Sequence, residues 1–137
     1  TAKENCWKVP FQGYKLKERR ILNNSLGNLL PLSIAKNSSL QNKCFLDKIN
    51  NGQNYIGYRF GSYSENEISG LTEWNAENIL ARGINLLKFM ERRWGLDFKT
   101  DDKRKEILNL TFIKTTATNK GLPKVGMKRK LIGRATK

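Results

Sequence analysis

Asparagine and lysine side chains recur at short intervals between residues 23 and 48, and their spacing is the feature of this chain that most directly predicts chemistry. A Gly27-Asn28 turn precedes a short apolar run at residues 29–32, which we expect to be an edge strand, and Asn37 stands just before a predicted helix over residues 39–50. A strand that leads through a loop to a helix can hold a divalent ion and a scissile phosphate together, because the free N–H groups of a first helical turn favour phosphate. The pattern therefore predicts a site for metal-dependent phosphodiester chemistry.

Such a site also needs a base that activates water, which is normally a histidine. The 137-residue sequence contains no His, and it begins with Thr1 rather than Met. We therefore expect the chain to be part of a longer protein whose base lies upstream of Thr1. We expect the part alone to be inactive.

The charge of the chain predicts the kind of partner it binds. Lys and Arg number 26 against 12 Asp and Glu, which gives a net charge of +14. The excess comes from residues 1–50, with nine basic and three acidic side chains, and from residues 101–137, with eleven and three. An imbalance of this size favours a polyanion as partner.

The two cysteines, Cys6 and Cys44, lack the Cys-x-x-Cys spacing that is typical of metal and redox sites. Reduced thiols in a cytoplasmic protein are the simplest interpretation. No apolar stretch is long enough to span a bilayer, so we expect no membrane association.

The clearest predicted helix covers residues 75–94, where apolar residues recur at helical spacing and form one broad face. Arg82 stands beside that face. We expect it to be buried and to pair with Glu77 or Glu91, rather than to contact a ligand.

Shorter elements are predicted around that helix. The helix over residues 39–50 is expected to begin with a capping box at residues 38–41. Further helices are predicted over residues 15–24 and 101–109, the second of them capped by Thr100. Alternating aromatic residues at 55–61 predict a strand.

Each candidate polar residue also has a purely structural interpretation. Gly27 and Asn28 together suit a turn that needs a positive φ, and Asn37 suits a helix N-cap. The lysines of this segment either form a solvated helix face or contact phosphate; they are Lys36, Lys43 and Lys48.

Taken in order, these residues resemble the C-terminal HNH-like nuclease domain of the GmrSD-type, modification-dependent restriction endonucleases. The resemblance runs from about residue 7 to residue 112. It is carried by Trp7, Phe11, Arg20, residues 22–33, Asn37, Gln41, Asn42, Phe45, Lys48, Trp74, Ile79, Arg82, Gly83, Leu86, Leu87, Arg93 and Trp94.

The resemblance implies an α+β, mainly helical fold in which a ββα-metal unit, here without its first strand, packs on additional helices. Residues 1–113 would form the nuclease domain, and residues 114–137 a basic tail or small hairpin. Asn28 would be the central Asn that pins the loop, and Asn37 would lie at the metal. Supporting roles would fall to Gly27, Asn42 and Arg82.

The resemblance also implies partners and a cofactor. The substrate would be modified double-stranded DNA, and one divalent metal, Mg or Mn, would serve the intact site. The parent protein would carry an N-terminal, nucleotide-dependent sensor domain. DNA contacts are expected from Lys36, Lys43, Lys48, Lys128, Arg129 and Lys130. The competing hypotheses are a non-catalytic nucleic-acid-binding module and a protein-interaction domain that docks its partner on the helix over residues 75–94.

Overall fold

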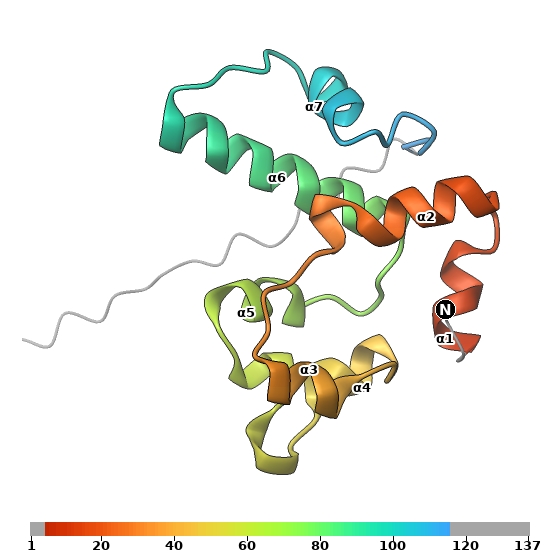
Figure 1. The fold of residues 1–137 in the computed structure, drawn as a ribbon, viewed down its shortest axis with the longest axis vertical. Helices are drawn as coiled ribbons and strands as arrows, with labels where there is room; N and C mark the ends of the chain where they lie inside the picture. Colours follow the sequence, from red (N-terminus) through yellow and green to blue (C-terminus); the bar gives the residue numbers. More distant parts are fainter. Residues whose placement is uncertain (1–4, 116–137) are drawn as a thin grey trace, which may run out of the picture.

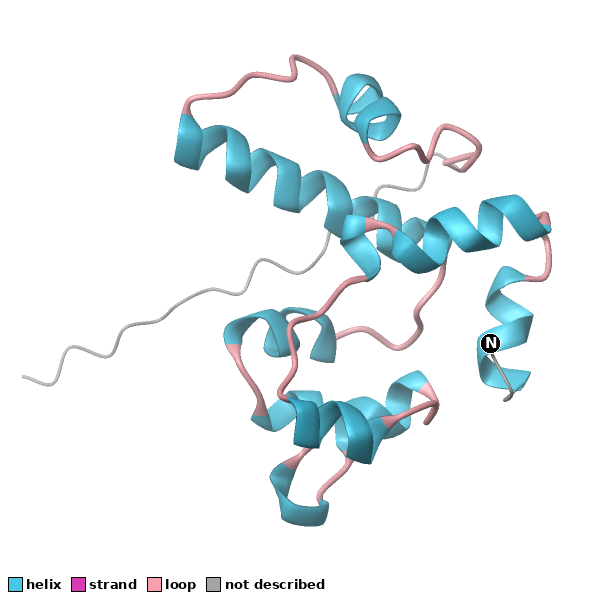
Figure 2. Ribbon diagram, in the orientation of Figure 1, coloured by secondary structure: helices cyan, strands magenta, loops and turns pink. Residues whose placement is uncertain are grey.

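The computed structural model describes residues 5–115, and this part of the chain is built from helices and 3-10 turns (Figures 1 and 2). The elements are α1 (Asn5–Lys8), η1 (Val9–Phe11), α2 (Leu16–Asn24), η2 (Leu26–Asn28), α3 (Ile34–Leu40), α4 (Phe45–Asn50), η3 (Gln53–Tyr55), η4 (Tyr58–Phe60), α5 (Tyr63–Ser69), α6 (Ala76–Trp94) and α7 (Asp101–Ile107). In Figure 1, α6 crosses the molecule with α7 above it and the short helices α3, α4 and α5 below it.

Helix α6 organises the core, as the sequence predicts. The Asn75 side chain caps it by accepting a hydrogen bond from the Asn78 N–H, and Gly95 ends it in the left-handed conformation at φ 66°. Its buried apolar face joins a core whose most completely buried side chains come from several elements: Leu22, Leu40, Ile49, Ile79, Leu110 and Ile113. Helix α7 is also confirmed, with Thr100 as its N-cap.

Gly27 is needed for close packing rather than for turn geometry. Its φ is not positive, so that expectation is wrong; among residues 5–115, Gly95 is the glycine with a positive φ. A Cβ atom on Gly27 would lie 1.9 Å from the carbonyl oxygen of Ile79 and 2.8 Å from the backbone nitrogen of Gly83. The η2 turn therefore rests directly on the backbone of α6.

The expected strands do not form within residues 5–115, so the β part of the α+β prediction has no counterpart there. Residue 29 is extended, but residues 29–32 pair with no other strand in this part of the chain. Residues 55–61 fold into 3-10 turns because Asn54 and Tyr55 both take positive φ values, 52° and 53°, which no strand accommodates.

The single helix predicted over residues 39–50 is two helices. Helix α3 begins earlier than expected because Ser33, not Ser38, is the N-cap and accepts a hydrogen bond from the Lys36 N–H at 3.2 Å. Helix α3 then ends at Gln41, whose φ of 37° is not helical, and α4 begins after Cys44. Asn37 consequently lies inside α3, with its N–H bonded to the carbonyl of Ser33, and not at a free helix N-terminus.

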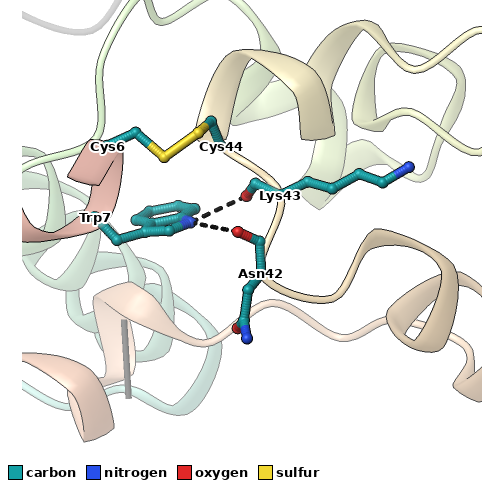
Figure 3. The surroundings of a disulfide bond; sticks show 5 residues. All are labelled: Cys6, Trp7, Asn42, Lys43 and Cys44. Atoms are coloured by element: carbon teal, nitrogen blue, oxygen red, sulfur yellow. Dashed lines mark hydrogen bonds between the residues drawn. A yellow bond between two sulfur atoms is a disulfide. The ribbon is translucent and has the colours of Figure 1, made fainter. Parts of the chain in front are cut away.

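The cysteines are joined, which corrects the prediction of reduced thiols. Cys6 on α1 and Cys44 at the start of α4 form a disulfide with an S–S distance of 2.02 Å (Figure 3). Their separation of 38 residues carries no motif, so only the fold brings them together.

Candidate functional site

A cleft of about 240 Å³ collects several of the residues that sequence reasoning selects. It lies among η2, α4, η4 and the start of α6. The lining residues are Trp7, Asn28, Leu30, Asn42, Phe45, Lys48, Tyr58, Ile68, Trp74 and Arg82. Asn28, Asn42, Lys48 and Arg82, which come from separate parts of the sequence, are therefore brought to one place.

Asn28 is held at the edge of this cleft by hydrogen bonds at both ends of its side chain. The Trp74 indole N–H donates to Oδ1 of Asn28 at 2.8 Å, and Nδ2 of Asn28 donates to the carbonyl of Asn23 at 3.1 Å. Trp74 itself is buried and stacks on Phe45 with ring centroids 5.4 Å apart. This geometry makes Asn28 a residue that fixes the η2 turn.

Arg82 of α6 also holds the η2 turn in place. It is 4% exposed, and its Nη1 donates to the carbonyls of Gly27 at 2.9 Å and residue 29 at 2.7 Å. Its burial is as predicted, but the ion-pair partner is Glu67, at 3.4 Å from Nε. Glu91 pairs with Arg104 instead, at 2.8 Å. Arg82 therefore fixes the η2 turn through these two hydrogen bonds.

Lys48 is the cation that this cleft leaves available. Its side chain is half-buried, with Nζ 5.2 Å from the centroid of the Trp7 ring. No carboxylate forms an ion pair with it in the described part of the chain. Burial lowers the pKa of the Lys48 ammonium, because the charged form loses water without gaining a counter-charge.

Trp7 forms one wall of the cleft, and sequence reasoning did not select it as a site residue. Its indole N–H donates to the backbone carbonyls of Asn42 and Lys43, both at 3.0 Å (Figure 3). The neighbouring Cys6 ties α1 to Cys44, so the disulfide and these hydrogen bonds fix the ring together. The signals in the sequence are that Trp7 belongs to the residues that carry the family resemblance and that it directly follows one of the two cysteines.

Tyr58 adds a neutral hydroxyl to the same cleft. Burial raises its pKa to about 12, with a further contribution from the nearby Glu65 carboxylate. The phenol therefore stays protonated at neutral pH and offers a donor rather than a charge.

Other predicted site residues lie outside the cleft. Asn37 is exposed on α3, and Lys36 forms an ion pair with the buried Glu65 of α5. Lys43 is exposed beside the cleft and offers its backbone carbonyl to Trp7. The three basic residues predicted in the tail lie outside the described residues; they are Lys128, Arg129 and Lys130.

The residues present do not fit a divalent metal ion. Within residues 5–115, no group of three or more Cys, Asp or Glu side chains is placed to hold a metal, and the chain has no His. The amide of Asn37 is a neutral ligand, and hard cations such as Mg²⁺ bind mainly to carboxylates.

Residues 5–115 contain no helix of the length and apolarity that a bilayer-crossing segment requires.

Comparison with known proteins gives one match. The family model described as GmrSD restriction endonucleases, C-terminal domain, matches residues 2–89, which is more than half of the chain. No curated protein and no solved structure matches the chain. The matched range contains every residue that lines the cleft.

Proposed function

We propose that this chain, which belongs to the family of GmrSD restriction endonuclease C-terminal domains, binds the phosphodiester backbone of DNA in the cleft around Lys48 as part of a DNA endonuclease. The observation that carries the proposal is the environment of Lys48. A half-buried ammonium group with no carboxylate partner in residues 5–115 is stabilised by an anion from outside the chain.

The surrounding residues divide into two roles under this proposal. Asn28, Arg82 and Trp74 hold the η2 turn against α6, so they position the cleft and do not touch DNA. Asn42 and Lys43 are exposed at its rim, where their side chains reach phosphates on either side of the one at Lys48. The net charge of +14 then attracts the duplex without choosing a sequence.

Water activation is assigned to residues outside this part of the protein. Because residues 5–115 offer neither a His nor a group of acidic side chains, we place the base and the Mg or Mn site elsewhere in the parent protein. The family-based role of Asn37 at the metal then depends on ligands from that other part. The chain alone is proposed to bind DNA without cutting it.

The parent protein is proposed to restrict modified duplex DNA, including phage DNA, under the control of an N-terminal nucleotide-dependent sensor domain. We propose residues 1–113 as one domain, because Leu110 and Ile113 share the core formed by Leu22 and Ile79. We propose the cytoplasm as its location, because the DNA that a restriction endonuclease cleaves lies in that compartment.

Lys48→Gln tests the proposal, with Lys8→Gln as a matched control. Lys8 also forms no ion pair within residues 5–115, but it is exposed on α1 and does not line the cleft. Fluorescence anisotropy with a labelled duplex, repeated over a range of salt concentrations, measures affinity and its salt dependence. Lys48→Gln should weaken binding and reduce the salt slope by about one phosphate contact. Equal effects of the two substitutions, with both variants folded, would remove Lys48 from the interface.

A second candidate function is a nucleic-acid-binding module without catalysis. The observation that favours it is the lack of His in a family whose function is cleavage. Lys48→Gln in the parent protein distinguishes the two functions. The substitution should slow DNA cleavage only if this domain presents the scissile strand.

A further inference from the structure

We propose that a second cleft, between α2, α6 and α7, binds a nucleotide, with the phosphate on Lys17 and Arg20 and the flat ring on an apolar floor. This cleft has a volume of about 580 Å³. Its lining residues are Lys17, Arg20, Ile21, Asn24, Ser25, Leu26, Leu87, Ile107, Leu108 and Asn109, none of which lines the cleft around Lys48.

One wall of this second cleft is cationic and uncompensated. Lys17 and Arg20 are three residues apart on α2, so their side chains lie on the same face of the helix. Neither forms an ion pair within residues 5–115, and the lining residues include no Asp or Glu. The nearby carboxylate of Glu18 accepts a hydrogen bond from the Lys15 N–H instead. The wall therefore favours an anion.

The floor of the cleft is apolar and comes from four elements. Ile21 of α2, Leu26 of η2 and Leu87 of α6 meet the end of α7. At that end, Ile107 remains 45% exposed although it borders the cleft. An apolar surface next to two cations suits a ligand that carries both a flat ring and a phosphate.

Ser25 supplies the observation that points most directly to a ligand. Its residue is 6% exposed, and its Oγ has no hydrogen-bond partner in the described part of the chain. Buried hydroxyl groups are nearly always hydrogen-bonded, because leaving one unpaired forfeits its interaction with water. Ser25 lines this cleft, and its Oγ exposes less than 1 Å², so the hydroxyl would pair with a polar atom of a bound ligand only after its side chain rotates toward the cleft.

These features together select a nucleotide over simpler anions. Inorganic phosphate would use the cations but not the floor, and a fatty acid would leave Ser25, Asn24 and Asn109 unused. The volume lies in the range of small-molecule sites. Two sources supply the same chemistry: a free mononucleotide, or one nucleotide of a single DNA strand.

NMR titration of the full 137-residue chain, labelled with ¹⁵N, tests the site with four probes: dTMP, thymidine, inorganic phosphate and an oligothymidylate. We expect dTMP to give saturable shifts at Ser25, Leu26 and Asn109, whereas thymidine and phosphate bind more weakly. Tighter binding of the oligothymidylate at the same amides would identify a DNA strand as the source. Equal binding per nucleotide would identify a free nucleotide.

Two variants separate a binding site from a structural feature. The double substitution Lys17→Gln and Arg20→Gln should weaken dTMP binding by about tenfold, while Arg19→Gln, on the same helix but outside the cleft, should change it little. Ser25→Ala should weaken binding but leave the thermal midpoint unchanged or raised, because its hydroxyl has no partner to lose.

Three results would overturn the proposal. They are no saturable shift with dTMP at about 10 mM, equal shifts from phosphate alone, and a Ser25→Ala variant that loses stability while keeping its affinity. Lys48→Gln distinguishes this site from the proposed DNA-binding cleft. The substitution should leave dTMP binding at the cleft between α2, α6 and α7 unchanged.

Discussion

The indole nitrogen of Trp74 donates a hydrogen bond to the side-chain oxygen of Asn28 at 2.8 Å, across 46 positions of sequence. This bond joins the η2 turn to the residue that stands two positions before α6. Together with Arg82, it fixes one edge of the cleft in which Lys48 has no ion-pair partner among residues 5–115.

Trp74→Phe should destabilise the domain by about 1 kcal/mol, because it removes the donor to Asn28 and keeps an aromatic ring against Phe45. Trp94→Phe is the matched control, since Trp94 is 61% exposed. Urea unfolding measures both variants. Equal stability of Trp74→Phe and the wild type would mean that the hydrogen bond contributes nothing to holding the turn.

Gly27→Ala should destabilise the domain by about 3 kcal/mol or prevent folding, because the new Cβ would collide with the carbonyl of Ile79. Gly70→Ala is the control: its φ is −84°, and a Cβ there meets nothing within 4 Å. Thermal unfolding and far-UV circular dichroism compare the two. A folded Gly27→Ala variant with wild-type stability would contradict the close approach of η2 to α6.

Reduction of the Cys6–Cys44 disulfide should lower the free energy of unfolding by about 4 kcal/mol on the chain-entropy account, given the separation of 38 residues. It should also loosen Trp7 from the cleft, which Trp fluorescence detects. Unfolding with and without reductant measures the effect, and the double variant Cys6→Ser and Cys44→Ser should be insensitive to reductant. Two free thiols in the native, non-reduced protein would contradict the bond.

The Lys36–Glu65 pair should make stability depend on acid pH. Burial tends to raise the pKa of Glu65, but hydrogen bonds from Lys36 and Ser62 outweigh it and hold that pKa below the ordinary value of a Glu carboxyl group. A depressed pKa in the folded state stabilises the protein above the unfolded value, and this stability is lost as the pH falls through the folded value.

Glu65→Gln should accordingly destabilise the domain at neutral pH and by less at pH values below the folded pKa of Glu65. Thermal midpoints measured across the acid range give this difference directly. A destabilisation that stays constant over the whole range would show that the charge of Glu65 is not what the native state stabilises.

The sequence predicts those parts of the fold that depend on local chemistry. Helix α6 is predicted because its apolar residues recur at helical spacing, which is a local signal, and α7 because Thr100 caps it. The strand predicted at residues 55–61 fails because Asn54 and Tyr55 take positive φ values, which the alternating aromatics do not indicate.

The site is predicted only in part for the same reason. Asn28, Asn42, Lys48 and Arg82 are found because they belong to a family pattern, and the structure brings them to one cleft. Trp7 and the disulfide are missed because they depend on contacts 35 to 38 residues apart. Ser25 is missed because an unpaired buried hydroxyl has no signature in sequence.

The pKa of the Lys48 ammonium, measured by NMR in the free protein and again with duplex DNA, tests the central claim most directly. In the free chain, burial without a counter-charge should hold this pKa below that of an exposed lysine. A phosphate bound at the cleft favours the charged form, so DNA should raise the Lys48 pKa. A Lys48 pKa that is unchanged or lower in the saturated complex would contradict the proposal that this cleft binds the DNA backbone.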